Sequence, residues 1–395
     1  MLTEKGDFPM IQIPLEPAIT EYLHRKASAS RIPLSGTFEL TPVCNMNCRM
    51  CYVRMSHQKQ QTIRPLRSAA EWLSLAEEAK KHGLLYLLLT GGEPFLHPEF
   101  RQILTGLQKM GFVISINSNG TLIDENTVAW LKECPPTRIN ITLYGASNET
   151  YDRLCGNPHG FTQVMRAIRL LREAGILVKL NCSITPHNAH DLEKIIEFAK
   201  EGKLVIQATS YMFPPLRRDS TKIGQNDRFT PEEAAYYSAK VEALLGGKEA
   251  FLARPEEDIP PLPSETEENC DASGDKIRCR AGKCSFWVTW EGTLMPCGMI
   301  PGDRDSNVFD IGFLPAWEKA MEAADAIRLP AKCASCSIKD TCRACAAMVL
   351  TETGCYTKAP EYRCQMAFAY APQRKKLKES LLLEEKLSAM LTDEV

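Results

Sequence analysis

The chain lacks long apolar stretches and any strong excess of charge of one sign. No uninterrupted apolar run approaches the roughly 18 residues of a membrane-spanning helix, and the formal net charge of the 395 residues is −2. The first ten residues, MLTEKGDFPM, do not place a basic segment before an apolar one, as a secretory signal peptide does. We therefore expect a cytoplasmic protein with no nucleic-acid and no membrane partner.

Cysteine is too scarce for a disulfide-stapled fold but abundant for a cytoplasmic chain. The 16 cysteines fall short of the roughly 8–10% of residues that marks a disulfide scaffold. Clustered cysteines in a reducing compartment more often bind metal. Three cysteines lie within positions 44–51 and ten within positions 270–364, and this grouping indicates metal centres.

Apolar runs of strand length alternate with amphipathic helical segments, which predicts an α/β fold. The runs that we predict as strands are residues 38–43, 84–90, 112–118, 139–145, 176–184 and 204–212. Helical periodicity separates them at residues 69–83, 98–110, 124–133, 161–175 and 191–202, and returns at 231–245. This alternation predicts a parallel sheet, but it fits a partial TIM-like barrel and a doubly wound sheet equally well.

Changes in composition divide the chain into five segments. A proline- and acid-rich stretch at 255–269 reads as a linker or surface loop. The cysteine-rich region beyond it has few long periodic runs, so its fold is expected to depend on metal. We predict an N-terminal extension (1–35), a core (36–246), a linker (247–278), a cysteine-rich domain (279–364) and a C-terminal segment (365–395) with a charged helix at 373–391.

The first cysteine group is Cys44, Cys48 and Cys51, a C-x3-C-x2-C spacing directly after the first predicted strand. Three thiolates on one short loop can hold three irons of a [4Fe–4S] cube and leave the fourth iron open. A zinc site would need a fourth, remote ligand, and three plain core cysteines are the remaining alternative. In a barrel, this loop would lie at the face where active sites gather.

The surroundings of this group resemble the radical S-adenosylmethionine (SAM) superfamily. Tyr52 is the aromatic residue that follows the cysteines in that family, and Gly91-Gly92-Glu93 is similar to its GGEP motif. The two glycines permit close backbone approach to a ligand. The resemblance implies a partial (β/α)6 TIM-like barrel in which Glu93 binds the methionine amine of SAM.

Softer matches imply further contacts to SAM. Asn119 lies in a segment that resembles the family's TNG turn, although a plain polar turn would look the same. The other residues that the resemblance places near SAM are Thr142, Arg153 and Asn181. Tyr144 stands where the family often has Asp, and Cys155 stands where a second Arg is usual, which puts the roles of those two positions in doubt.

The second cysteine group resembles the SPASM extension of radical SAM enzymes, which carries two auxiliary [4Fe–4S] clusters. Its eight thiols would fill two four-cysteine clusters. By the resemblance, the first cluster would be held by Cys279, Cys284, Cys297 and Cys345. The second would be held by Cys333, Cys336, Cys342 and Cys364. A one-residue contraction before Cys345 leaves that ligand open, Cys270 and Cys355 could substitute, and a pair of zinc ribbons is the alternative.

The resemblance implies an enzyme that cleaves SAM to a 5′-deoxyadenosyl radical and removes hydrogen from a ribosomally made peptide, for crosslinking or another oxidation. An external one-electron donor of the flavodoxin or ferredoxin type is expected, and so is a separate leader-binding protein if a leader is recognised. The alternatives are a sulfatase-maturase-like enzyme and one acting on a small molecule or haem precursor. Sulfatase-maturing members carry an acid where this chain has Gly298. An iron–sulfur electron carrier or a zinc scaffold is the non-enzymatic alternative.

Overall fold

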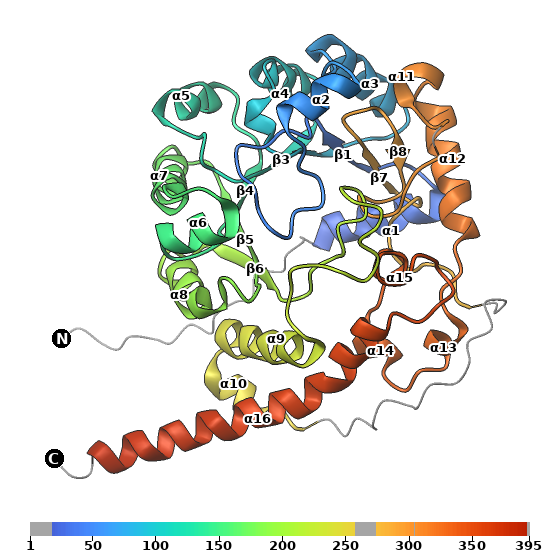
Figure 1. The fold of residues 1–395 in the computed structure, drawn as a ribbon. Coiled ribbons are helices and arrows are strands. Elements are labelled where there is room, and N and C mark those ends of the chain that lie inside the picture. Colours follow the sequence, from blue (N-terminus) through green and yellow to red (C-terminus); the bar gives the residue numbers. More distant parts are fainter. Residues whose placement is uncertain (1–17, 257–273, 304, 393–395) are drawn as a thin grey trace.

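The structure, a computed structural model, describes residues 18–256, 274–303 and 305–392. Its centre is a curved eight-stranded sheet in the order β6-β5-β4-β3-β2-β1-β7-β8 (Figure 1). The strands are β1 (Ser35–Glu39), β2 (Tyr86–Thr90), β3 (Val113–Ser118), β4 (Arg138–Thr142), β5 (Val178–Ser183), β6 (Val205–Thr209), β7 (Ser285–Val288) and β8 (Leu294–Met295).

The first six strands are parallel and lie side by side in chain order. A doubly wound sheet would instead reverse its winding at a switch point. The order therefore decides between the two predicted architectures, and the expected partial (β/α)6 barrel is confirmed. Each of the six predicted runs overlaps a strand. β1 begins three residues earlier than predicted, because Ser35 already pairs with Tyr86 and Ser285, and it ends at Glu39, where the loop begins.

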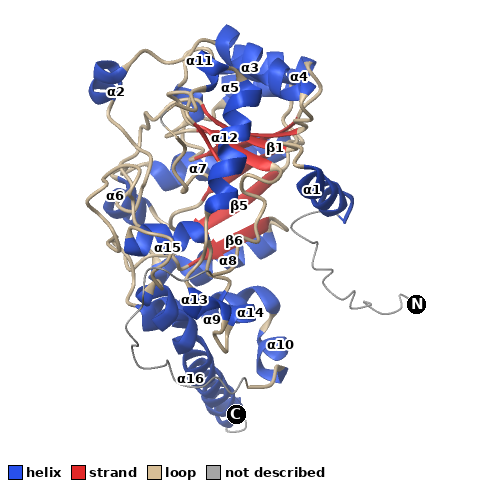
Figure 2. Ribbon diagram, turned by 90° about the vertical axis from the view of Figure 1, so that its right-hand side faces the viewer, coloured by secondary structure: helices blue, strands red, loops and turns tan. Residues whose placement is uncertain are grey.

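Helices cover the outer face of this arc (Figures 1 and 2). Those between the barrel strands are α2 (His57–Ile63), α3 (Ala69–Lys81), η1 (Pro94–Leu96), α4 (Phe100–Lys109), α5 (Glu125–Glu133), α6 (Asn148–Cys155), α7 (Gly160–Glu173), η2 (Ala189–Asp191) and α8 (Leu192–Glu201). Local sequence fixes their starts: Ser68 and Glu71 form a reciprocal capping box at α3.

Side chains alternate between the two faces of each strand, because successive residues of a strand point in opposite directions. On β4, Ile139 and Ile141 are fully buried on the face opposite that of Asn140 and Thr142. The face of β4 that meets the helices is therefore apolar, and the opposite face, toward the barrel interior, carries polar side chains.

The cysteine-rich region is built into the same sheet. β7 pairs with β1 in parallel, with Ser35 opposite Ser285, and β8 pairs with β7 antiparallel. Its helices are α11 (Val308–Ile311), α12 (Phe313–Ala326), α13 (Ala331–Ala334), α14 (Lys339–Cys342) and α15 (Ala346–Thr353). This region thus continues the barrel wall beyond β1.

Of the remaining helices, α1 and α16 lie near the two ends of the chain, and α9 and α10 follow β6. They are α1 (Ala18–Ser30), α9 (Pro231–Gly246), α10 (Lys248–Ala253) and α16 (Glu361–Thr392). α16 packs along α9 and then extends away from the body (Figure 1). The C-terminal helix therefore begins 12 residues before the predicted one, and α10 occupies the start of the expected linker, of which residues 257–273 lie outside the described residues. The five proposed segment boundaries stay a prediction.

None of the described helices is long and apolar enough to cross a membrane.

Candidate active site

The loop after β1 carries the three predicted cluster cysteines. Two of their sulfurs accept backbone N–H groups of the same loop: Met46 N lies 3.4 Å from Cys44 Sγ, and Arg54 N lies 3.3 Å from Cys51 Sγ. The side-chain amide of Asn119 lies 3.6 Å from Cys44 Sγ. Such N–H···S contacts suit thiolate ligands.

The GGEP turn packs directly on this loop. Gly92 N donates to Thr41 O at 2.6 Å, and Glu93 N donates to Val43 O at 2.9 Å. A Cβ on Gly91 or Gly92 would lie 2.4 Å from the carbonyl oxygen of Thr41 or Val43, respectively. The glycines therefore allow the turn to approach the cluster loop, whereas the sequence suggested that they clear space for a ligand.

Glu93 is fully buried beneath the loop. Its carboxylate accepts hydrogen bonds from Asn119 N at 2.7 Å, Ser118 Oγ at 2.9 Å and Phe95 N at 3.2 Å. Burial raises the pKa of Glu93 to about 7, although the three donors act in the opposite direction. A carboxylate has about four acceptor positions, so one is left for another donor such as an ammonium group.

Asn119 ties the turn after β3 to the cluster loop. Its side chain donates to Asn45 Oδ1 at 2.9 Å and accepts from Thr121 N and Oγ1 at 2.9 and 2.7 Å. The side chain is 8% exposed. These contacts give Asn119 a structural role in addition to the predicted contact to SAM.

The three other predicted SAM contacts fall in two places. Thr142 and Asn181 are register neighbours on β4 and β5 and share one face of the sheet. Arg153 instead lies outside this face, where its guanidinium donates to His187 O at 2.8 Å and contacts His190 Nε2 at 3.2 Å. The structure therefore brings Thr142 and Asn181 together but not Arg153.

A buried ion pair closes the barrel mouth. Both oxygens of Glu39 accept from Arg217, at 3.0 and 2.8 Å, and Trp287 Nε1 donates to the same carboxylate at 3.0 Å. Arg217 also donates to Gly298 O at 3.3 Å. The segment after β6 is thereby fastened to β1, to β7 and to the turn beyond β8.

A cavity of about 530 Å³ lies beside this ion pair. We call it the Glu291 cavity. Its wall comes from the loop after Cys51, the segment after β6, the β7–β8 hairpin and the end of α15, and includes Tyr52, Met55, Leu216, Trp290, Glu291 and Met299. It therefore lies between the cluster loop and the cysteine-rich region. Burial raises the pKa of Tyr52 to about 12.

Glu291 is the carboxylate of this cavity that lacks a fixed partner. Its side chain accepts no hydrogen bond from any residue in the described part of the chain, whereas its backbone carbonyl accepts from Arg64 at 2.7 Å and Asn307 at 3.1 Å. Burial, reinforced by the charge of Glu39, raises the pKa of Glu291.

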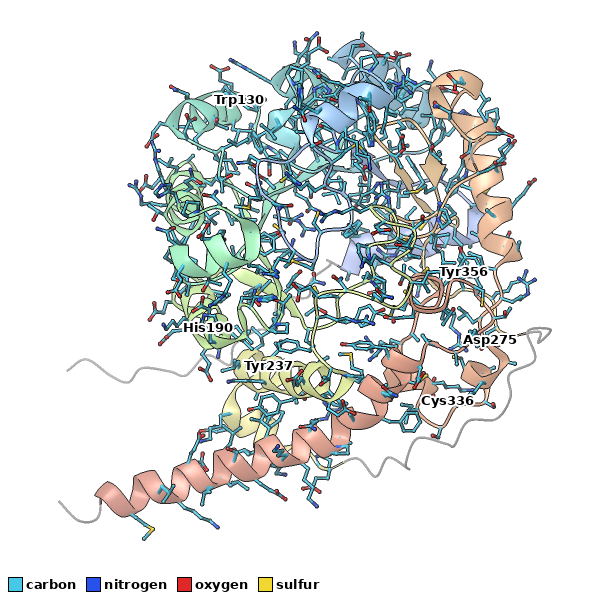
Figure 3. All side chains as sticks on the ribbon, viewed as in Figure 1. Trp130, His190, Tyr237, Asp275, Cys336 and Tyr356 are labelled. Carbon is cyan, nitrogen blue, oxygen red and sulfur yellow. The ribbon has the colours of Figure 1, made fainter. Side chains whose placement is uncertain are left out.

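Six of the predicted auxiliary ligands line a second cavity, of about 320 Å³. They are Cys279, Cys333, Cys336, Cys342, Cys345 and Cys364. Figure 3 shows Cys336 and Asp275 at this site, far from Trp130 on α5. Cys297 lies close enough to Cys279 and Cys345 for their negative charges to raise its pKa, although burial is the larger cause.

Cys284 lies elsewhere. It is fully buried in a cluster with Ala27 and Leu34, and Ser28 Oγ donates to its sulfur at 3.0 Å. Cys284 therefore packs toward α1 and, unlike Cys279 and Cys345, does not line the second cavity. Cys355 follows α15, with its sulfur 3.8 Å from Thr353 Oγ1, and Cys270 lies outside the described residues.

The thiols of the first loop fit an iron–sulfur cube. The pKa of Cys44 is raised to about 12, chiefly by burial and in smaller part by the charges of Glu93, Cys48 and Cys51. A thiolate at this place therefore needs a strong positive partner, which iron would supply. Within the described ranges, no three Cys, His, Asp or Glu residues are grouped to hold a single metal ion, but a four-iron cube spaces its thiolates more widely.

Comparisons with known proteins agree with this geometry. Residues 38–199 match the family model of the radical SAM superfamily. An AdoMet-dependent haem synthase of Methanosarcina barkeri is 25% identical over 345 residues, which cover 82% of this chain and 94% of the relative. The antilisterial bacteriocin subtilosin biosynthesis protein AlbA of Bacillus subtilis is 26% identical over 280 residues, 70% of this chain and 58% of AlbA.

The fold also matches that of SuiB from Streptococcus suis, in its crystal structure bound to the precursor peptide SuiA. The TM-score is 0.62 at 19% identity, covering 92% of this chain and 84% of SuiB. A partial barrel, a three-thiol loop and a GGEP turn together define a radical SAM enzyme. Residues 38–199 therefore form a radical SAM domain, and the chain as a whole is similar in sequence to AlbA and in fold to SuiB.

The family confirms SAM and one [4Fe–4S] cluster as cofactors. The individual ligand and SAM-contact residues stay predictions. Sequence reasoning missed Glu39 and Glu291. The position of Glu39 on the interior face of β1 was a usable signal, because a charged side chain inside a barrel requires a partner.

Proposed function

We propose that this protein modifies a ribosomally made peptide. Cys44, Cys48 and Cys51 would hold a [4Fe–4S] cluster, and SAM bound there would supply the radical chemistry that takes a hydrogen atom from the peptide. Oxidative modification or crosslinking of a side chain follows. The observation that carries this proposal is the Glu291 cavity, which lies between the cluster loop and the cysteine-rich extension.

The size and lining of this cavity suit peptide side chains. About 530 Å³ is in the usual range of roughly 300–1,000 Å³ for ligand sites. Its wall is largely apolar, and Glu291 adds one carboxylate without a fixed partner. AlbA, which takes part in the biosynthesis of a bacteriocin, and SuiB, which binds a precursor peptide, support the same substrate class.

Two auxiliary [4Fe–4S] clusters in the extension complete the proposal. Cys279, Cys297 and Cys345 would contribute to the first, with Cys355 or Cys270 as its fourth ligand in place of Cys284, which packs against α1. The four ligands proposed for the second line one cavity and are Cys333, Cys336, Cys342 and Cys364. These clusters would accept the electron that an oxidised substrate radical gives up.

The proposed partners are an external one-electron donor of the flavodoxin or ferredoxin type and, where a leader peptide is recognised, a separate leader-binding protein. We place the enzyme in the cytoplasm, because its clustered cysteines suit the metal binding that is typical of a reducing compartment.

A haem precursor is the second candidate substrate. The haem synthase of Methanosarcina barkeri aligns over 94% of its length, whereas AlbA aligns over 58%. A sulfatase-maturase role is less compatible with the structure. A Cβ at Gly298 would lie 2.8 Å from Cε3 of Trp287, so an acidic side chain would not fit there without moving that ring.

The test is anaerobic reconstitution with iron and sulfide, followed by incubation with SAM and dithionite. One arm uses any small peptide encoded beside the gene, and the other uses tetrapyrrole precursors of haem. The proposal expects 5′-deoxyadenosine in both arms and a mass change only in a peptide. A mass change only in the tetrapyrrole would favour the second candidate. Absence of 5′-deoxyadenosine in both arms would contradict both candidate functions.

A further inference from the structure

A row of polar side chains crosses the interior face of the barrel on four consecutive strands, β3 to β6. Its members are Asn117, Asn140, Lys179 and Gln207. In the register of the sheet, Asn117 lies opposite Asn140, and Asn140 lies opposite Lys179. The predicted SAM contacts Thr142 and Asn181 are two residues further along β4 and β5 and share this face. Two residues of a strand span roughly 6.6 Å, so the row lies just beneath the place where SAM is expected.

Two hydrogen bonds join the row in pairs. Asn140 Nδ2 donates to Asn117 Oδ1 at 2.7 Å, and Lys179 Nζ donates to Gln207 Oε1 at 2.7 Å. Asn140 Oδ1 is buried and accepts no hydrogen bond from any described residue, in a side chain that is 6% exposed. A buried amide oxygen without a donor is destabilising, so a ligand with an N–H group would suit this position.

Two cations of this face lack an acidic partner. Among the described residues, Lys179 forms no ion pair, and its side-chain hydrogen bond goes to the neutral Gln207. Arg138 begins β4 on the face of Asn140. Its Nε is buried, and its guanidinium has no ion pair or hydrogen bond in the part of the chain that the structure describes.

The surroundings of these two cations favour an anionic ligand. Burial and, to a smaller extent, the positive charge of Arg138 lower the pKa of Lys179, as happens when an ammonium group is partly desolvated beside another cation. No carboxylate acts in the opposite direction. Partly buried charges are normally paired, and a bound carboxylate would supply the missing negative charge.

The barrel interior is open beside these residues. On β6, Val205, Gln207 and Thr209 are exposed, whereas the alternate positions are half-buried. Val205 lies opposite Lys179, so the exposed side of β6 is the interior one. Leu177, directly before β5, is 67% exposed. A closed barrel fills its interior with its own side chains, and here that face is accessible to a ligand instead.

We propose that Arg138 and Lys179 select the substrate by binding one of its carboxylates on the interior face of the barrel, while Asn140 accepts a hydrogen bond from a neighbouring N–H group. An acidic residue or the C-terminal residue of a peptide carries both groups. Guanidinium and ammonium groups form strong, charge-assisted hydrogen bonds with a carboxylate. This inference rests on the proposed function, because it names the feature of the peptide that the enzyme recognises.

The first test needs no identified substrate and uses the reconstituted full-length protein. N-Hydroxysuccinimidyl acetate labels lysines, and mass spectrometry of the digested protein measures the labelling of Lys179. We expect glutarate, a dicarboxylate, to slow this labelling several-fold and its neutral diamide, glutaramide, to leave it unchanged. Lys132, exposed on α5, is the control and should be labelled equally in both.

Arg138→Gln shows whether the two cations act together. Loss of one charge-assisted hydrogen bond should weaken glutarate binding about tenfold, so the variant should need correspondingly more glutarate for the same protection of Lys179. Lys194→Gln, on the exposed side of α8, should match the wild type. Equal labelling of Lys179 with and without glutarate in the wild type would overturn the proposal.

Turnover distinguishes this inference from the proposed function. With a peptide that the wild type modifies, Arg138→Gln and Lys179→Gln should each raise KM about tenfold and affect kcat less. Peptides in which the acidic side chains are amides, or in which the C-terminus is amidated, identify the bound carboxylate, since the wild type should lose its advantage over the variants with one of them. Unchanged KM in both variants would overturn this inference and leave the proposed function standing. If no peptide is modified, the proposed function fails, and the glutarate experiment still decides whether the two cations bind a carboxylate.

Discussion

Arg228 and Glu352 form a two-point ion pair between the segment after β6 and α15. The distances are 2.6 and 2.8 Å, and the two side chains are 5% and 3% exposed. Tyr211 Oη also donates to Glu352 at 2.6 Å, and the guanidinium lies 3.4 Å from the centre of the Tyr362 ring. The barrel and the cysteine-rich extension are thus joined by a desolvated polar contact.

Glu352→Gln should destabilise the protein strongly, because it leaves the buried guanidinium of Arg228 without its counter-charge. Breaking a buried pair costs about 3–5 kcal/mol. Urea unfolding of the apo-protein measures this loss. Glu133→Gln is the control, since the Arg101–Glu133 pair is 60% and 70% exposed and should contribute less than about 1 kcal/mol. Equal effects of the two substitutions would contradict the assigned role.

Replacing Cys44, Cys48 and Cys51 together by alanine should remove one cluster and all SAM cleavage. The reconstituted wild type is expected to hold about 12 iron atoms, and the triple variant about 8. Iron and sulfide analysis, together with 5′-deoxyadenosine quantification, measures both effects. Cys134→Ala is the control, as its sulfur lies 3.6 Å from Thr105 Oγ1, away from the loop. Full iron content in the triple variant would refute the cluster assignment.

Cys284→Ala should keep the iron content of the wild type, because Cys284 packs against α1 and does not line the cavity of Cys279 and Cys345. Cys279→Ala and Cys345→Ala should each lower the iron content. Metal analysis after anaerobic reconstitution compares the three. A loss of iron from Cys284→Ala as large as from Cys345→Ala would support the grouping that the resemblance implied.

Glu93 should make the apo-protein less stable as the pH rises from about 4.5 to about 7. Its pKa is raised from 4.5 to about 7 in the folded chain, so the folded chain keeps a proton that the unfolded chain has released. Stability is full below the lower value and is lost toward the higher one, by about 3 kcal/mol at most. Urea unfolding at pH 5 and pH 7.5 measures it.

The comparison with Glu93→Gln isolates this effect from other titrating groups. Between pH 5 and pH 7.5, the variant should gain stability relative to the wild type, whereas the exposed-site variant Glu133→Gln should track the wild type. A constant difference between Glu93→Gln and the wild type at both pH values would disprove the linkage.

Glu291→Gln should separate radical formation from product formation. Oxidation of a peptide that loses a hydrogen atom and an electron also releases a proton, and Glu291 is the cavity's carboxylate without a fixed partner. We expect 5′-deoxyadenosine to form as in the wild type and the modified peptide to fall by about 100-fold. Mass spectrometry measures both, with Glu318→Gln on the exposed face of α12 as control. Wild-type yield of modified peptide would exclude the role.

The sequence predicted the barrel well because its strands are short apolar runs with no competing interpretation, such as residues 84–90. It also predicted the three-thiol loop, since Cys44, Cys48 and Cys51 are local in the chain. It could not place Cys284, whose spacing fits a ligand set but whose side chain packs against α1. The Glu39–Arg217 pair was missed for a related reason: its partners are 178 positions apart, and no local pattern connects them.

The pairing of β1 with β7 has a consequence for how the chain becomes active. Ser35 lies opposite Ser285, so the first strand receives its second neighbour only after about 250 further residues have been synthesised. Contacts so distant in sequence form late, and until then one edge of β1 stays open beside the cysteine loop. Assembly of the oxygen-sensitive centre is therefore expected only after most of the chain has been made, with the newly made thiols dependent on the cell's iron-delivery machinery during that interval.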